Sequence, residues 1–519
     1  MDDILGKCDW AKDIISISLG KIANKSGLKY ADVRFEVSEG KVAAAIAGTP
    51  RSAEEDYGIG LGIRVLADVN GISAPGYLGK SFGQDDLSGL REMMPSLYDI
   101  AFRRAKRNAE LKAKFIKKYR VFGKGLHSTP LAETPIFQDS VGAKYKKSPH
   151  DTDLEQFSKR IAGASANVQK KKGVASNTLA AVTGFTRKVF ASTEGALIDQ
   201  TKALTEAFFF IAAKGKAMES YYDHLGEYHG LEAFEKENFH SLSLEDWAAF
   251  IADGTIELSN APAVDDEKDA VVVTDPWYNA LLSHEITGHP SEADRALKKE
   301  AAWAGRAWWF TSLEKNKIGQ QVASEELSVF SDPTIDGYGY YKYDDEGVKA
   351  KRILNIKNGV LNEFLNSRET ASVLGIEPNG GMRATSAENV PLVRMNNTCF
   401  AAGTWKKDEM IEDVKKGYYV VGQKTPSIGE TRQNFRITCW KIYRIEKGQI
   451  GQLYRKGGLT ADSHTFLKSI DAVGDDFRIY NIPNCGKGTP MQTMRVGNGG
   501  PHIRGVASVT GMSIREADP

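Results

Sequence analysis

The stretch GIGLGIRVLADVNGISAPGYLG, residues 58–79, decides the fold class of this chain. Two runs of mainly apolar residues flank Asn70-Gly71, a pair that favours the two-residue turn of a β-hairpin. The same pattern returns at Asn358-Gly359, within ILNIKNGVLNEFL, and at Lys447-Gly448, within CWKIYRIEKGQIGQLYRKG. Turns this tight join antiparallel strands. The sequence therefore predicts an α+β protein of two lobes, with mostly antiparallel sheets flanked by helices.

Helical patterns occur around these strands, mainly in the first third of the chain. Residues 9–26 carry apolar residues at helical spacing, residues 84–120 form a long helical region, and residues 153–171 form a further helix. Another hairpin turn is expected at Glu39-Gly40, between YADVRFEVS and KVAAAIAG. We therefore expect helices to flank the predicted sheets.

The length of the chain predicts two domains, because 519 residues exceed the size at which one hydrophobic core keeps growing. We expect an N-terminal α+β domain at residues 1–220 and a strand-rich C-terminal α+β domain at residues 221–519. The first domain contains a helical, basic and loop region at about 84–171. Within it, residues 103–120 are rich in Lys and Arg, a pattern typical of a solvated helix face. Residues 121–152 are polar and predict a loop.

Charge and composition exclude several classes of partner. A formal net charge of +1 gives no electrostatic reason to expect nucleic acid or an anionic membrane as partner. The start of the chain lacks the basic and apolar regions of a signal peptide, and no apolar run is long enough to span a bilayer. Four cysteines without a CxxC pair are too few for a disulfide framework. We therefore expect a cytoplasmic protein.

The stretch SHEITGHP, residues 283–290, holds the residues with the clearest chemical potential. Glu285 follows His284 directly, as in the zinc-peptidase motif H-E-x-x-H, but the second histidine, His289, comes five residues after the first instead of four. In a regular α-helix five residues turn by about 140° from the starting direction, which would point the two imidazoles apart. Two histidines at this spacing can share one ion only if the helix is distorted.

The residues around His289 predict such a distortion. Asp275-Pro276 favours the start of a helix, as N-cap and first helical residue. Gly288 has the conformational freedom that a kink or π-bulge needs, and Pro290 disfavours helical geometry before it. Ser291 to Asp294 has the pattern of a capping box that starts a new helix. A broken helix would let His289 turn back toward His284. The alternative is that His284 is a buried core histidine, His289 only caps the end of a helix, and Glu285 is solvated.

A third protein ligand is needed, because catalytic zinc sites have three protein ligands and an open position. The local candidates are Glu292 and Asp294, followed by Glu325 and Glu326. The distant candidate is Cys485, in the glycine-rich stretch NIPNCGKGTPMQTMRVGNGG, where a thiolate could approach a metal; a buried hydrophobic cysteine is the alternative. Cys399 and Cys439 lie in strand-like settings and are expected to be buried hydrophobic residues, and Cys8 has no predicted role.

At this point the chain resembles the TldD/PmbA family, in its TldD-type branch that carries the metal motif. The resemblance extends through most of the chain, except residues 103–150. Two segments depart from the family pattern, HPSEAD and TPSIGETRQNFRI, and these departures bear on the inferred contacts with substrate more than on the metal site. The motifs that carry the resemblance are YADVRFEV, EDYGIGLGIRVL, LLSHEITGHPSEAD, YDDEG, GGMRATSAENVPLVRMNNT and NCGKGTPMQ.

The resemblance implies a zinc metallopeptidase. It implies that His284, His289 and Cys485 bind Zn²⁺, that Glu285 is the general base, and that unfolded or modified peptides are hydrolysed within a homodimer or a heterodimer with a family paralogue. The alternative is a non-catalytic scaffold or regulatory subunit of such a dimer. A regulator of a nucleic-acid enzyme would need a basic groove that the sequence lacks, and a purely structural zinc site would close its shell with four protein ligands.

Overall fold

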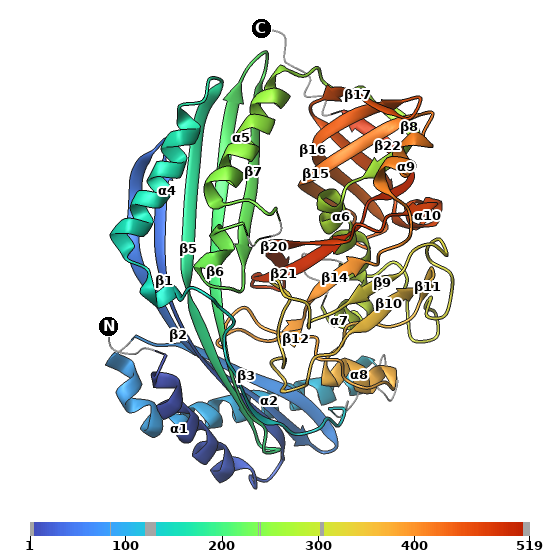
Figure 1. Ribbon diagram of the computed structural model, residues 1–519. Coiled ribbons are helices and arrows are strands. Elements are labelled where there is room, and N and C mark those ends of the chain that lie inside the picture. Colours follow the sequence, from blue (N-terminus) through green and yellow to red (C-terminus); the bar gives the residue numbers. More distant parts are fainter. Residues whose placement is uncertain are drawn as a thin grey trace.

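The computed structural model consists of two lobes that lie side by side (Figure 1). It describes residues 5–83, 85–119, 131–236, 238, 240–300 and 306–511. One lobe is a large curved sheet with long helices, and the other, from Glu267 onward, is built mainly of strands. The predicted α+β class with mostly antiparallel sheets is confirmed.

Seven strands form the large sheet, in the order β3-β2-β1-β5-β6-β4, with β7 also paired to β6. All pairings are antiparallel except that of β4 with β6. Four of the strands, β1, β2, β5 and β6, have 18–21 residues, far above the usual five or six or so. The strands are β1 (Leu28–Ile46), β2 (Thr49–Val69), β3 (Ile72–Ser81), β4 (Gln138–Val141), β5 (Val174–Ser192), β6 (Leu197–Lys214) and β7 (Met218–Glu227).

Four helices cover one face of this sheet, because alternate residues of each strand are apolar. On β1, Val33, Phe35 and Val37 contribute to the core beneath the first two helices, and Ala43 and Ala45, on the same face, contribute to the core beneath the other two. Lys and Arg side chains between 103 and 118 remain exposed or half-exposed, as predicted. The helices are α1 (Lys7–Ile22), α2 (Leu90–Tyr119), α4 (Leu154–Gln169) and α5 (Leu244–Asn260).

The opposite face of the large sheet is polar and contacts the C-terminal lobe. Arg64 of β2 forms an ion pair of 2.6 Å with Glu346, and Lys188 of β5 forms one of 3.0 Å with Asp345. Both acids come from the YDDEG motif. This motif therefore joins the two lobes.

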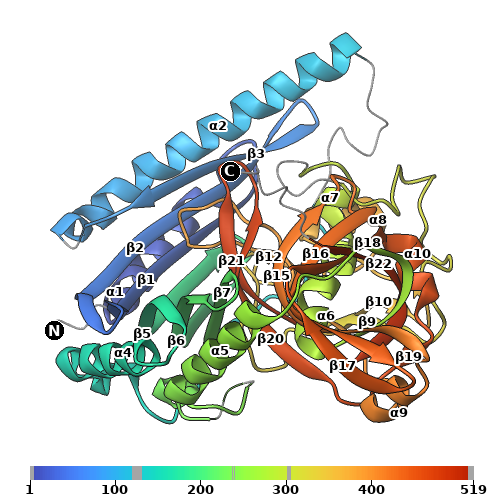
Figure 2. The ribbon, with the colours of Figure 1, turned by 90° about the horizontal axis from the view of Figure 1, so that it is seen from above.

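The C-terminal lobe contains a closed ring of strands. The order is β15-β8-β22-β18-β16-β17, and β15 also pairs with β16, so five strands close on themselves. In Figure 2, α6 (Pro276–Ser283) lies within the outline of this ring, and all of its residues are buried. The strands are β8 (Glu267–Thr274), β15 (Lys416–Ile428), β16 (Asn434–Glu446), β17 (Gln449–Tyr454), β18 (Gly457–Asp462), β19 (Ala472–Val473, paired with β22) and β22 (Ile503–Gly511).

A second sheet of this lobe has the order β11-β10-β9-β14-β21-β20. Its strands are β9 (Val329–Ser331), β10 (Ile353–Lys357), β11 (Val360–Leu361), β14 (Asn397–Phe400), β20 (Arg478–Lys487) and β21 (Gln492–Gly500), and β12 (Met382–Arg383) pairs separately with β13 (Leu392–Val393). The short helices are α7 (Ala293–Ala296), α8 (Arg368–Leu374), α9 (Lys407–Glu412) and α10 (Ser463–Ser469). Single 3₁₀ turns occupy Asp85–Gly89, Pro149–Asp151, Leu231–Phe234 and His289–Ser291.

Three of the predicted hairpin turns are confirmed. In the pairs Asn70-Gly71, Asn358-Gly359 and Lys447-Gly448 both residues have a positive φ, as a type I′ turn requires. Each pair joins two adjacent antiparallel strands.

The prediction of a turn at Glu39-Gly40 is wrong, because strand β1 continues through these residues to Ile46. The turn lies instead at Ala47-Gly48, where φ is +50° and +82°. Gly40 is paired with Gly184 of β5. A Cβ at Gly184 would lie 2.0 Å from the Glu39 carbonyl oxygen. The glycines serve the close approach of two strands, not a reversal of the chain.

The domain boundary predicted after residue 220 stays a prediction. The large sheet ends with β7, and α5 packs on that sheet before the C-terminal lobe begins. Of the loop predicted at 121–152, residues 121–130 lie outside the described residues, and β4 lies in the remainder. Within the described residues, no helix is long and apolar enough to cross a bilayer.

Candidate metal centre

The helix that carries the histidines begins as the sequence predicts. Asp275 ends the segment after β8, and its carboxylate accepts a hydrogen bond of 2.7 Å from the Tyr278 N–H. Pro276 is the first residue of α6. This N-cap anchors the helix at the end of a strand of the closed ring, which places the following turn deep in the lobe.

After Ser283 the helix changes to a π-turn that spans His284–Gly288. The His289 N–H donates to the His284 carbonyl, five residues earlier, as in a π-helix. The π-turn needs five residues for one full turn of the helix, so residues five apart, such as His284 and His289, project from the same side of the helix. Their ring centroids are 4.6 Å apart. The predicted distortion of the helix is confirmed.

Gly288 serves the turn through its small size and not through its conformational freedom. Gly288 has an ordinary right-handed conformation, with φ −64° and ψ −60°, so its freedom to adopt other angles is not used. A Cβ at this position would instead lie 2.1 Å from the Met395 sulfur. The predicted capping box at Ser291 to Asp294 is wrong. Glu292 is the N-cap of α7 without a side-chain bond, and the Ser291 hydroxyl donates to the Thr287 carbonyl at 2.6 Å.

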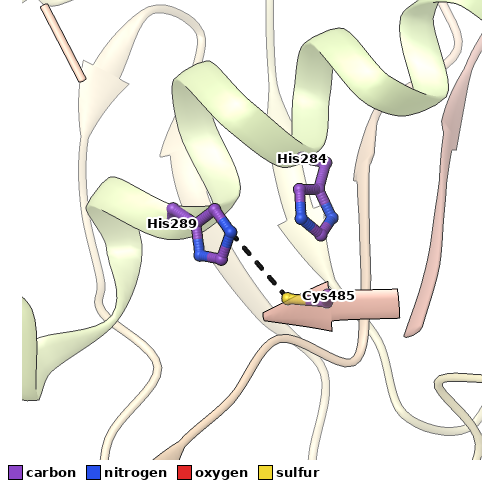
Figure 3. A group of neighbouring side chains, drawn as sticks. All are labelled: His284, His289 and Cys485. Atoms are coloured by element: carbon purple, nitrogen blue, oxygen red, sulfur yellow. Dashed lines mark hydrogen bonds between the residues drawn. The ribbon is translucent and has the colours of Figure 1, made fainter. Parts of the chain in front are cut away.

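Cys485 reaches the two histidines from β20, as Figure 3 shows. Its sulfur lies 3.8 Å from His289 Nε2, and the ligand atoms of His284, His289 and Cys485 all lie within 4.8 Å of one another. The pairing of β20 with β21 shifts register just before Cys485, a bulge of the kind that redirects a side chain. In the part of the chain that the structure describes, this is the one group of three residues placed to hold a metal ion.

The second nitrogen of each imidazole is held by a neighbouring side chain. His284 Nδ1 lies 2.9 Å from Asn498 Oδ1, and the Asn498 amide is oriented by donating to the Thr398 carbonyl at 2.8 Å. His289 Nδ1 lies 3.1 Å from Glu292 Oε2. The Asn498 oxygen favours a proton on His284 Nδ1 and leaves Nε2 of that ring available to a metal. His289 Nδ1 also lies 3.1 Å from Arg295 Nη2, and its Nε2 is the nitrogen that faces Cys485. Such outer contacts are typical of metal-binding histidines.

The other candidate ligands lie elsewhere. Glu292 is fully buried against Arg295 and Lys487, on the side of His289 that faces away from Cys485, and Asp294 accepts a hydrogen bond of 2.7 Å from Lys487. Glu325 and Glu326 are exposed and do not belong to the group. Of the alternatives left open by the sequence, Glu292 contacts only Nδ1 of His289, and Cys485 is the one whose ligand atom joins those of both histidines.

The four cysteines are all buried, but their environments differ. Burial raises the pKa of Cys439 to about 12 and that of Cys399 well above its ordinary value. Burial acts in the same direction on Cys485, but the charges of His284, His289 and Arg394 outweigh it and hold the pKa of this thiol well below its ordinary value. Cys485 is therefore the cysteine whose surroundings favour the thiolate, the form that binds metals.

The three residues line a cavity of about 270 Å³ between the lobes. Its walls include Tyr221 to His224 of the edge strand β7 and residues of β15 and β20. Glu285 lies in the same wall, and its Oε2 accepts a hydrogen bond of 2.5 Å from Arg432 Nη1. A molecule that enters the cavity would meet this carboxylate and the three candidate ligands together.

The donor set fits a zinc ion. Two imidazole nitrogens and one thiolate are the ligand types that zinc selects, and three protein ligands leave a fourth position open to water or substrate. The outer contacts of both imidazoles support the same conclusion, because they present Nε2 of each ring.

Comparison with known proteins places the chain in a family. Residues 267–511 match the model of the PmbA/TldA metallopeptidase C-terminal domain. The chain is 32% identical to a metalloprotease of Methanothermobacter thermautotrophicus over 368 residues, which cover 70% of this chain and 76% of the relative. The chain belongs to the TldD/PmbA family of metallopeptidases. The resemblance seen in the sequence motifs is thereby confirmed.

Other family members and solved structures agree. A metalloprotease of Methanocaldococcus jannaschii is 29% identical over 93% of this chain and 97% of its own length. A zinc metalloprotease TldD homologue of Saccharolobus solfataricus is 33% identical over 45% of this chain and 49% of its own length. The structure of TldE from Thermococcus kodakarensis superposes with a TM-score of 0.65 at 16% identity, covering 95% of this chain and 99% of that one. At this identity the likeness concerns the fold alone.

Sequence reasoning missed three residues that surround this TldD/PmbA site. Asn498 lies within the glycine-rich end of β21, and Arg394 donates a hydrogen bond to the Cys485 carbonyl. Arg432 pairs with Glu285 across 147 residues of sequence. Asn498 and Arg394 lie within or beside motifs that carry the family resemblance, whereas Arg432 lies in TPSIGETRQNFRI, a segment that departs from it.

Proposed function

We propose that the chain is a zinc-dependent peptidase in which His284, His289 and Cys485 hold Zn²⁺ and Glu285 is the general base. The observation that carries this proposal is the convergence of the three ligand atoms within 4.8 Å, in a cavity that also exposes Glu285. Glu285 follows His284 in the same π-turn. The turn that aligns the two imidazoles therefore also sets the backbone position from which the Glu285 side chain extends.

Zinc, when bound, supplies Lewis acidity that acidifies water and polarises a peptide carbonyl. The residues of the chain perform the proton transfers. The Glu285 carboxylate takes a proton from the attacking water and delivers it to the nitrogen of the leaving amine. Asn498 and Glu292 keep the two imidazoles in the orientation that presents Nε2. The negative charge of the Cys485 thiolate weakens the Lewis acid relative to a site of three neutral imidazoles, so we expect modest turnover.

The substrates we propose are unfolded or modified peptides, as the resemblance to the TldD/PmbA family implies, and the cavity between the two lobes is the place where they would bind. The pairing of the chain, as a homodimer or with a family paralogue, remains a prediction. The non-catalytic scaffold is the less favoured alternative, since the described site retains three ligand candidates and the carboxylate.

The test compares the wild-type chain with Glu285→Gln on a mixture of carboxymethylated casein peptides. We expect one zinc per chain in both proteins and peptide hydrolysis only in the wild type, lost on chelation and restored by Zn²⁺. Glu326→Gln, at an exposed glutamate outside the site, is the matched control and should retain activity. Full activity of Glu285→Gln would rule out this base, and a zinc-loaded wild type without peptidase activity would favour the scaffold.

A further inference from the structure

Arg432 has a left-handed backbone conformation in a turn beside the candidate metal centre. It lies in the turn between β15, which ends at Ile428, and β16, which begins at Asn434. Its φ is +65°, in the left-handed region that non-glycine residues rarely adopt. Residues held in this region cost free energy, and such outliers concentrate at functional sites.

The turn holds Arg432 in this conformation through several hydrogen bonds. The Arg432 N–H donates to the Gly429 carbonyl at 2.8 Å, and the Ser463 hydroxyl donates to the Arg432 carbonyl, also at 2.8 Å. Ser463 N–H donates to the Gln433 carbonyl at 2.5 Å. The first residue of α10 therefore fixes the tip of the hairpin, and the strained residue cannot relax without losing these contacts.

The side chain that this conformation directs inward ends at the candidate base. Arg432 and Glu285 are both less than a tenth exposed, and their Nη1 and Oε2 atoms form an ion pair of 2.5 Å. Both side chains line the cavity of the metal centre. A buried ion pair is weak support for stability, because the removal of two charges from water offsets their attraction. The position of the pair in the wall of the metal centre therefore points to a role beyond stability.

We propose that Arg432 is a positioning residue, which holds the Glu285 carboxylate by one oxygen and fixes the direction in which the other faces the cavity. The inference rests on the proposed function, since it assigns Arg432 a role through the general base. A carboxylate on a flexible side chain samples several rotamers, and displacement of a reacting group by about 1 Å can cost about 100-fold in rate. The guanidinium restricts that freedom by holding one carboxylate oxygen.

Substitution to glycine provides a clean test, because glycine accepts a positive φ and removes the side chain without adding strain. We expect Arg432→Gly to bind zinc like the wild type, to lose about 10- to 100-fold in kcat, and to keep KM within about threefold. Guanidinium ion at millimolar concentration should restore part of kcat, and Arg432→Lys should be intermediate. Lys447→Gly is the matched control, since Lys447 is an exposed cation with φ +50° in another hairpin turn of the same ring.

A second readout does not depend on activity. Thermal unfolding of the wild type, Arg432→Gly, Glu285→Gln and the double variant, with and without zinc, measures the coupling of the pair. We expect Arg432→Gly to lower Tm more in the wild-type background than in the Glu285→Gln background. Additive Tm changes, an unchanged kcat, or a rise in KM alone would each overturn the proposal, the last by making Arg432 a substrate contact. If the wild type lacks zinc-dependent activity, the proposed function fails. The comparison of Tm values among the single and double variants still decides whether Arg432 and Glu285 interact.

Discussion

The His289 N–H donates to the carbonyl of His284, and this i to i+5 hydrogen bond converts one helical turn into a π-turn. The spacing of five residues, which would separate the two imidazoles in an α-helix, therefore brings their rings to 4.6 Å. The five-residue spacing of the histidines therefore suits a π-turn, as a four-residue spacing would suit an α-helix.

Gly288→Ala should disturb this turn. A Cβ there would lie 2.1 Å from the Met395 sulfur in a buried site, so we expect a loss of about 1–3 kcal/mol in stability and weaker zinc binding. Thermal unfolding and chelator competition measure the two effects. Gly163→Ala, in α4, is the control, because a Cβ there meets nothing within 4 Å and alanine should stabilise the helix. If Met395→Ala does not reduce the cost of Gly288→Ala, the proposed contact is not its cause.

Asn498→Leu should weaken zinc binding by about 10- to 100-fold, because it removes the acceptor that holds His284 Nδ1. Zinc affinity measured against a chromophoric chelator tests this. Asn355→Leu is the matched control: Asn355 is equally buried but accepts a hydrogen bond from Ser331, away from the histidines. An equal loss of affinity in both variants would indicate general destabilisation instead of a defect at the site.

Cys485→Ser should abolish stoichiometric zinc binding, because the thiolate supplies one of three ligands. Cys399→Ser should retain one zinc per chain, since Cys399 is buried in β14 apart from the group. Metal analysis of the purified variants gives the answer. A zinc-loaded Cys485→Ser protein would show that the sulfur is dispensable.

Asp223 predicts a pH dependence of stability. Burial raises the pKa of this carboxyl to about 7, although Trp247 Nε1 donates to it at 2.8 Å. The pKa of Asp223 is higher in the folded protein than in the unfolded chain, so the folded state binds the proton more tightly. The free energy of unfolding therefore falls as pH rises from the unfolded pKa toward 7 and the carboxyl loses this proton. Asp223→Asn should therefore gain Tm relative to the wild type between pH 5 and pH 8, by the equivalent of about 2 kcal/mol.

The control for this experiment is Asp336→Asn, at an exposed carboxylate whose ion pair with Lys144 is solvated. Its Tm difference from the wild type should stay flat over the same pH range. A flat profile for Asp223→Asn as well would mean that the buried carboxyl does not retain its proton.

The sequence predicted the local geometry of the fold better than its long-range contacts. Asn70-Gly71 and Lys447-Gly448 form turns because glycine and its neighbour accept left-handed angles, a property of the pair itself. Glu39-Gly40 has the same appearance, but Gly184, far away in sequence, decides its structure by approaching too closely for a Cβ. A pairing partner at such a distance leaves no mark in the local pattern.

The same distinction holds at the metal centre. The broken helix at His289 is visible in the sequence, since Gly288 and Pro290 stand on either side of it. The placement of Cys485, and not Glu292, among the candidate ligand atoms is not visible there, because it depends on Lys487 and Arg295, which bind the Glu292 carboxylate. Resemblance to the family supplied that choice. Arg432 reaches Glu285 from a hairpin that no motif marks.

The most direct test of the account is the zinc-edge X-ray absorption spectrum of the zinc-loaded protein. We predict one sulfur at about 2.3 Å and two imidazole nitrogens at about 2.0–2.1 Å, with the remaining position filled by a light atom. A spectrum without a sulfur shell, or with fewer than two imidazoles, would contradict the proposed coordination of zinc by His284, His289 and Cys485.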